Sequence, residues 1–101
     1  DELRRKIEDR GTTNFPEAAG RKLYGELTMV ITVNFDGRVL ATEVVESSRQ
    51  KALDARAQAI VKSLSFGAFS PAMRQRADQI VVVSRFRFTR DETLQTQLSG
   101  Q

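Results

Sequence analysis

The residues that could do chemistry are few, and they form no recognised catalytic pattern. The 101-residue chain contains no cysteine and no histidine. Their absence excludes disulfides, thiolate nucleophiles, Ser-His-Asp triads and zinc sites built from imidazole or thiolate. An enzyme would have to rely on carboxylates alone. The candidates are Asp36, Glu43, Glu46 and Asp54, and their positions indicate a turn, a surface and a helix face. We therefore predict a non-enzyme without cofactor or metal.

A second group of candidates combines cations with aromatic rings near the end of the chain. Arg85, Arg87 and Arg90 alternate with or follow Phe86 and Phe88, a mixture that single-stranded nucleic acid can use. On a strand, however, the phenylalanines would point away from Arg85 and Arg87. The chain has 16 Lys and Arg against 13 Asp and Glu, a net charge of only +3. We predict no nucleic-acid partner.

Three segments are predicted to be strands. Residues 25–34 alternate apolar and polar side chains with the two-residue period of a strand. Asp36 and Gly37 then suit a hairpin turn into a second strand at residues 38–46. Adjacent Val44 and Val45 interrupt the alternation there and indicate a bulge. The third strand is QIVVVSRFRF, residues 79–88.

The helices are predicted from spacing and capping residues. Leu53, Ala57, Ile60, Val61 and Leu64 share one face of an amphipathic helix. Residues 1–10 suit a marginal helix capped by Gly11. Asn14 as N-cap and Pro16 in the first turn predict a further short helix that ends at Gly20.

Together these elements predict an α+β fold with a three-stranded antiparallel sheet of order 2-1-3, with one face covered by the amphipathic helix and with short N-terminal helices. Residues 1–13 are a lead-in, residues 14–90 the folded domain, and residues 91–101 a polar tail that we expect to be loose. No stretch is long and apolar enough to cross a bilayer.

This arrangement leaves the outer edge of the last strand unpaired. Arg85, Arg87 and Arg90 could simply blunt the edge. Alternatively, the edge receives an extended peptide by strand addition. The predicted partner-binding residues are Gln79, Ile80, Val81, Val82, Val83, Ser84, Arg85, Phe86, Arg87 and Phe88.

Several motifs, in their order and spacing, resemble the C-terminal domain of TonB proteins. They are NFP, KLYGELTMVITVNFDGRV, ESS followed by ALDARAQAIVKSL, an aromatic-rich turn with Pro71, and VVVSRFRF. The resemblance covers residues 14–89. The preceding RRKIEDRG is similar to the lead-in of TonB-like proteins of Gram-negative bacteria.

The resemblance implies the periplasmic domain of an energy transducer anchored in the inner membrane. Such proteins work with the ExbB-ExbD proton-driven motor. They bind the TonB box, a short segment of outer-membrane transporters for siderophores, haem or cobalamin, as an added strand beside the domain's last strand. That position maps onto residues 79–88. The anchor and the proline-rich spacer are missing from this chain, which therefore resembles an excised C-terminal piece.

Three points stay open. Relatives often carry glutamine before the aromatic-proline pair, in a segment that also touches the transporter. This chain has Thr12, Thr13 and Asn14 there, which could form a secondary partner contact or only a polar turn and cap. A TolA-like periplasmic interaction domain shares the architecture but commonly carries a disulfide. A homodimer through paired free edges is also open.

Overall fold

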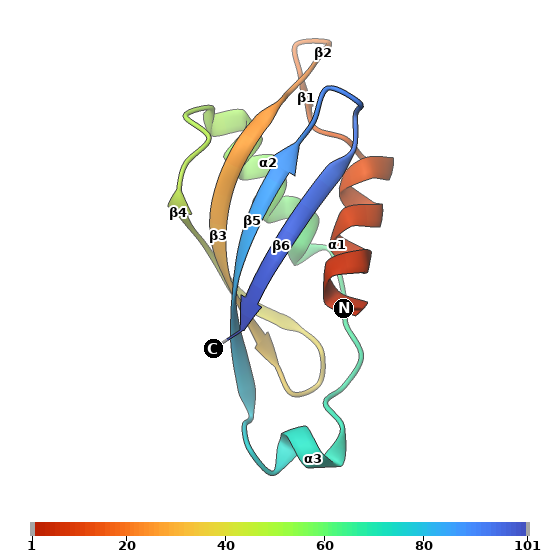
Figure 1. Cartoon of the computed structure of the whole chain (residues 1–101), viewed down its shortest axis with the longest axis vertical. Coiled ribbons are helices and arrows are strands. Elements are labelled where there is room, and N and C mark those ends of the chain that lie inside the picture. Colours follow the sequence, from red (N-terminus) through yellow and green to blue (C-terminus); the bar gives the residue numbers. More distant parts are fainter. Residues whose placement is uncertain (1, 101) are drawn as a thin grey trace.

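The computed structural model describes residues 2–100, which form an α+β fold (Figure 1). The elements are α1 (Glu2–Thr13), β1 (Glu17–Ala18), β2 (Arg21–Lys22), β3 (Gly25–Asn34), β4 (Val39–Glu46), α2 (Lys51–Lys62), α3 (Pro71–Arg74), β5 (Gln79–Phe88) and β6 (Leu94–Gly100). No helix within residues 2–100 has the length and apolar character needed to cross a membrane.

The main sheet has four antiparallel strands in the order β4-β3-β5-β6, so the predicted three-stranded sheet is one strand short. The three predicted strands are confirmed, with the first of them central. The fourth strand is β6, which lies in the segment that we expected to be a loose tail. Its residues Leu94, Thr96 and Leu98 face the core side while Gln95 and Gln97 are exposed. This alternation has the two-residue period of a strand, but the core-facing position 96 is a polar threonine, so only Leu94 and Leu98 gave an apolar signal.

The turn between β5 and β6 carries no glycine, which hid the hairpin from sequence reasoning. The amide of Thr89 donates to the carbonyl of Thr93 at 3.0 Å, and the amide of Glu92 donates to the carbonyl of Thr89 at 2.9 Å. Glu92 adopts a positive φ of 61°. A turn followed by one left-handed residue is a common three-residue hairpin connection.

The β3–β4 hairpin is confirmed, including the bulge. Thr28 pairs with Glu46 and Met29 with Val44, so Val45 has no opposite residue. A second irregularity leaves Leu40 unpaired in the same way between Val39 and Ala41. Two bulges in an eight-residue strand bend β4 and interrupt its ladder.

The N-terminal segment differs from the prediction in two places. α1 runs through Gly11 to Thr13, so Gly11 is not a cap. Instead, a Cβ on Gly11 would lie 2.3 Å from the Leu94 side chain, so glycine lets the helix approach β6 closely. The predicted helix that ends at Gly20 is wrong, because β1 and β2 form a small hairpin there. Its turn contains two successive positive φ angles, 53° at Ala19 and 78° at Gly20, as a type I′ turn requires.

The core lies between the sheet and the two longer helices. α2 packs on β4, and α1 packs on β6 and α2, so both helices cover the same face of the sheet (Figure 1). The core residues with at most 2% of their surface exposed include Ile7 of α1, Met29 and Ile31 of β3, Leu53 and Val61 of α2, and Phe86 and Phe88 of β5. We call the opposite side of the sheet the open face.

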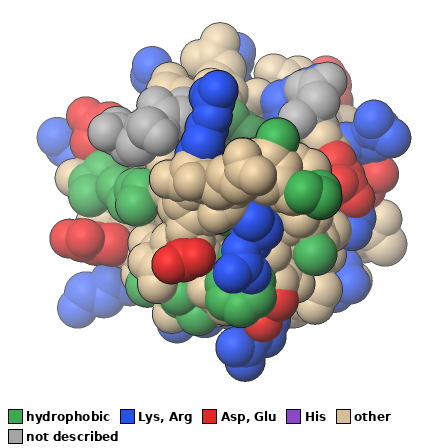
Figure 2. Space-filling model, turned by 90° about the horizontal axis from the view of Figure 1, so that it is seen from below, with side chains coloured by type: hydrophobic (Ala, Val, Ile, Leu, Met, Phe, Trp, Pro, Cys, Tyr) green, Lys and Arg blue, Asp and Glu red, His purple; other side chains and the backbone are tan. Residues whose placement is uncertain are grey.

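At the end of the molecule that carries α3, residues 2–100 show no single large apolar surface in the view of Figure 2. Hydrophobic side chains there are separated by charged and polar ones (Figure 2). Phe69 is partly buried against the core, and Met73 is 41% exposed.

Candidate functional site

β5 carries the candidate site, and its two faces differ in character. Phe86 and Phe88 are 0% and 2% exposed on the helix-covered face, where Val82 is also buried. Arg85 and Arg87 are exposed on the open face. The predicted assignment of these side chains is confirmed. Ser84 joins the buried face at 0% exposed, and its hydroxyl has no hydrogen-bond partner within residues 2–100.

The inner edge of β5 is fully paired. Its register with β3 runs without interruption from Gly25 opposite Phe88 to Asn34 opposite Gln79. The ten-residue strand is therefore fixed in place along its whole length by the centre of the sheet. Any partner strand has to use the outer edge.

The outer edge of β5 is covered by β6 over most of its length, so the expectation of a free edge is wrong for residues 82–88. The pairing runs from Val82 opposite Gly100 to Phe88 opposite Leu94. The physical reason is that the strand's N–H and C=O groups need partners, and the following segment reaches them through one tight turn. Residues 79–81 extend beyond β6, and no residue in 2–100 pairs with their outer side.

The opposite edge of the sheet, on β4, is poorly suited to strand addition. Its two bulged residues, Leu40 and Val45, are 46% and 49% exposed. Bulges break the regular row of amides and carbonyls that an added strand would need. We therefore assign the candidate site to β5 and its β6 cover.

The open face beside this edge carries excess positive charge. The Arg85 guanidinium lies 2.9 Å from a Glu26 carboxylate oxygen, and the Arg87 guanidinium lies 3.9 Å from the other oxygen. One carboxylate thus serves two guanidiniums, whose side chains are 64% and 63% exposed. A surface groove of about 670 Å³ extends from these arginines past β6 to α1, and it is lined by Arg4, Glu8, Glu26, Arg85, Arg87, Gln95, Thr96 and Gln97.

Comparison with protein families decides the identity. The model of the family described as Gram-negative bacterial TonB protein C-terminal matches residues 13–89. The chain belongs to this family. Comparison with curated proteins and with solved structures gave no significant match. The TonB C-terminal domain is a periplasmic protein-interaction domain rather than an enzyme. Of the two envelope systems that the sequence suggested, the match names TonB.

The matched part of this TonB domain ends at residue 89, before β6 begins. The covering strand is thus outside the match, as is nearly all of α1, which ends at Thr13. Strands β3, β4 and β5 of the main sheet and helix α2 lie within the match. The sequence predicted β5, which lies within the match, but it did not predict the covering strand β6.

The three polar residues before Phe15 lie where α1 ends. Thr12 and Thr13 belong to the last turn of α1, and the amide of Asn14 donates to the carbonyl of Arg10 at 2.9 Å. The Thr12 hydroxyl accepts a hydrogen bond from the amide of Leu94 at 3.1 Å, so this segment contacts β6. Thr13 and Asn14 are exposed. Contact of these residues with a transporter stays a prediction.

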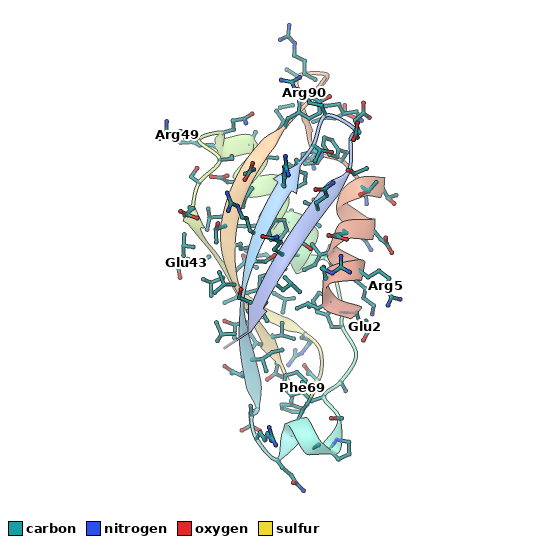
Figure 3. All side chains as sticks on the ribbon, viewed as in Figure 1. Glu2, Arg5, Glu43, Arg49, Phe69 and Arg90 are labelled. Carbon is teal, nitrogen blue, oxygen red and sulfur yellow. The ribbon has the colours of Figure 1, made fainter. Side chains whose placement is uncertain are left out.

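The carboxylates considered for catalysis lie in three places: Asp36 in the β3–β4 turn, Glu43 and Glu46 on β4, and Asp54 on α2. Asp36 accepts hydrogen bonds from the Arg38 amide and from Asn34 within the hairpin turn, and the Arg38 amide in particular holds the pKa of Asp36 below its ordinary value. Glu46 accepts the Thr28 hydroxyl at 2.7 Å, and Glu43 lies on β4 (Figure 3). Within residues 2–100 no acidic cluster could hold a metal ion.

The arginines and phenylalanines do not form a stacking surface. Phe86 and Phe88 are buried under the helices, on the face away from Arg85 and Arg87. Arg90 lies apart at the β5–β6 turn (Figure 3), with its guanidinium 4.8 Å from the centre of the Tyr24 ring. Stacking of nucleic-acid bases would require an exposed aromatic ring beside the cations of β5, and residues 2–100 place none there.

Proposed function

We propose that this TonB domain binds the TonB box of outer-membrane transporters by β-strand addition along Gln79–Phe88. The observation that supports this most directly is that β5 is locked to the sheet centre on its inner edge, while its outer edge is covered only by a short strand outside the family match. An added backbone there completes the sheet just as β6 does.

The incoming strand starts at residues 79–81 and takes the place of β6. Within residues 2–100 no residue pairs with the outer side of these three residues, so pairing can begin there before β6 moves. Each further residue of the partner then replaces one residue of β6, starting from Val82. Because bonds are exchanged one for one, the barrier stays below that of detaching β6 in a single step.

Exchange of this kind gives modest affinity. Each backbone hydrogen bond contributes about 0.5–1.5 kcal/mol net, but the bonds to β6 are lost as those to the partner form. Association itself costs at least about 4 kcal/mol. We expect weak equilibrium binding, and a load along the paired strands still has to break several bonds together.

In the whole protein, this binding would couple the inner-membrane proton motive force to siderophore, haem or cobalamin uptake. We propose that an N-terminal anchor outside this sequence joins the domain to the inner membrane and to the ExbB-ExbD motor. Thr12, Thr13 and Asn14 form a secondary contact with the transporter. A homodimer would require two copies to exchange β6 for each other's β5 edge.

Titration of the isotope-labelled domain with TonB-box peptides tests the strand site. We expect chemical-shift changes in residues 79–90, in β6 and at Thr12, because loss of β6 also removes the partner of the Thr12 hydroxyl. A peptide with proline at alternate positions is the control, since proline cannot donate to a ladder. Changes confined to β4 or to the α3 end would overturn the proposal.

A further inference from the structure

The two elements that flank the family match are bound to each other. The amide of Thr96 donates to Glu8 Oε2 at 2.7 Å, and the Thr96 hydroxyl donates to the same oxygen at 3.2 Å. The amide of Leu94 donates to the Thr12 hydroxyl at 3.1 Å. Both acceptors belong to α1, and both amides belong to β6.

These amides are the first two outer-edge donors of β6. In an antiparallel ladder, successive residues direct their N–H groups to opposite sides. Since Leu94 and Thr96 donate to α1, Gln95 and Gln97 direct theirs toward β5. Side chains of α1 therefore stand where a fifth strand would otherwise pair, and they satisfy the first part of this edge.

Packing reinforces the polar contacts. Gly11 of α1 lies so close to Leu94 that a Cβ there would be 2.3 Å from the leucine side chain. Ile7 is 0% exposed and Leu94 only 2% exposed, and both belong to the main core. Glu8 is also held from its other side, because Arg4 donates to Glu8 Oε1 at 3.1 Å. The ribbons of α1 and β6 run side by side (Figure 1).

We propose that α1 is a latch that holds β6 on the outer edge of β5, so that release of α1 opens the partner site. This inference rests on the proposed strand site, and it adds a control element whose hydrogen bonds to the sheet go to β6. If β6 leaves while α1 is docked, the hydrogen bonds of two amides to α1 and the burial of Leu94 are lost together with the pairing to β5. If α1 is undocked, only the pairing with β5 holds β6 in place.

The latch makes apparent affinity depend on the fraction of molecules with β6 released. A ligand for a binding-competent state that is rarely populated binds more weakly by that fraction. Substitutions in α1 that weaken its contacts with β6 should therefore strengthen peptide binding while leaving every β5 residue unchanged. If the contact between α1 and β6 only stabilised the fold, the same substitutions would weaken peptide binding, because destabilised domains bind less well.

The test compares Glu8→Ala with Asp9→Ala in the full 101-residue chain. Glu8 accepts both Thr96 donors, whereas Asp9 is an exposed carboxylate one position along the same helix. Without peptide, we expect the Gln95 and Gln97 amides to exchange hydrogen at least about tenfold faster in Glu8→Ala, which is the size of one lost hydrogen bond to a charged group. Amides of the β3–β4 ladder should be unchanged.

With a TonB-box peptide, we expect the dissociation constant of Glu8→Ala to fall by the same factor and that of Asp9→Ala to stay constant. Thr12→Val removes the acceptor of the Leu94 amide without changing side-chain shape. It should also speed β6 exchange and lower the dissociation constant, and it takes the place of Glu8→Ala in the test if that variant folds poorly. Unchanged β6 exchange, or equal acceleration in β3 and β4, would overturn the latch. Faster β6 exchange without any peptide binding would support the latch and overturn the proposed strand site.

Discussion

At the scale of single residues, Ser84 is the one polar side chain that β5 buries without a partner. Its hydroxyl is fully buried, and no residue in 2–100 forms a hydrogen bond with it. An unpaired buried hydroxyl costs about 1–3 kcal/mol of desolvation. β5, which carries the candidate site, therefore includes a buried hydroxyl at Ser84 that lowers the stability of the domain.

We expect Ser84→Ala to raise the free energy of unfolding by roughly 1 kcal/mol, because it removes the unpaired hydroxyl and leaves almost no cavity. Urea unfolding measures the change. Ser99→Ala, on the exposed side of β6, should stay within about 0.5 kcal/mol of wild type. A destabilised Ser84→Ala would mean that the hydroxyl has a partner.

Asp54 makes the stability of the domain depend on pH. Burial raises its pKa, but hydrogen bonds from the Ser47 and Ser48 hydroxyls and the Ser48 amide outweigh this, and the pKa lies below its ordinary value of 3.8. The fold thus favours the ionised carboxylate. The resulting stabilisation is present above pH 3.8 and is lost as the pH falls through the lower, folded-state pKa.

We expect Asp54→Asn to lower the free energy of unfolding by about 1 kcal/mol at pH 7, the net size of one typical hydrogen bond. The difference from wild type should shrink as the pH falls below 3.8. Denaturant unfolding at pH 7 and pH 3 tests this. A difference that is constant with pH would show that the carboxylate's charge is not involved.

Arg85 and Arg87 should influence which strand binds. A strand in β6's place puts alternate side chains opposite these arginines, where Gln97 and Gln95 now lie. Opposite charges across a ladder contribute about 0.2–1 kcal/mol per pair. We expect Arg85→Gln with Arg87→Gln to weaken an acidic TonB-box peptide about threefold or more at low salt, and less at high salt. Lys51→Gln, on α2, should have no effect; equal loss for a neutral peptide would contradict this role.

At the scale of elements, sequence reasoning succeeded where period and turn residue agree. Residues 25–34 alternate cleanly, Asp36-Gly37 suits positive φ, and Leu53, Ala57, Ile60 and Val61 are buried as predicted. It failed where non-glycine residues adopt positive φ, at Ala19 and Glu92. Those turns create the β1–β2 hairpin and β6. Gly11 was assigned to a cap because its actual role depends on Leu94, 83 positions later in the sequence.

The β3–β4 hairpin depends on Gly37 for two separate reasons. Its φ is 90°, and a Cβ there would lie 1.8 Å from the Phe66 carbonyl oxygen. Gly20 has a similar φ of 78° but no atom within 4 Å. Gly20→Ala should therefore cost only the left-handed conformation, about 1–2 kcal/mol. Gly37→Ala should cost at least about 1 kcal/mol more in thermal or urea unfolding; equal losses would mean that the connecting segment is free to move away.

At the scale of the whole molecule, one sheet serves both folding and binding. The matched part supplies β3, β4, β5 and α2, and the flanking elements α1 and β6 close the remaining edge. The sequence predicted which strand carries the site but not that its edge is covered, because β6 is polar on one side and reaches its place through a turn without glycine. The central claim is that a partner strand has to replace β6.

A reversible disulfide between β5 and β6 tests this claim most directly, since the chain has no cysteine of its own. Val83 and Ser99 are directly opposite each other, so Val83→Cys with Ser99→Cys can lock the cover closed. Val30→Cys with Glu43→Cys locks β3 to β4 instead and is the control. We predict that oxidation of the first pair abolishes TonB-box binding and that reduction restores it, while the control pair binds equally in both states. Unchanged binding by the oxidised Val83–Ser99 variant would contradict the account.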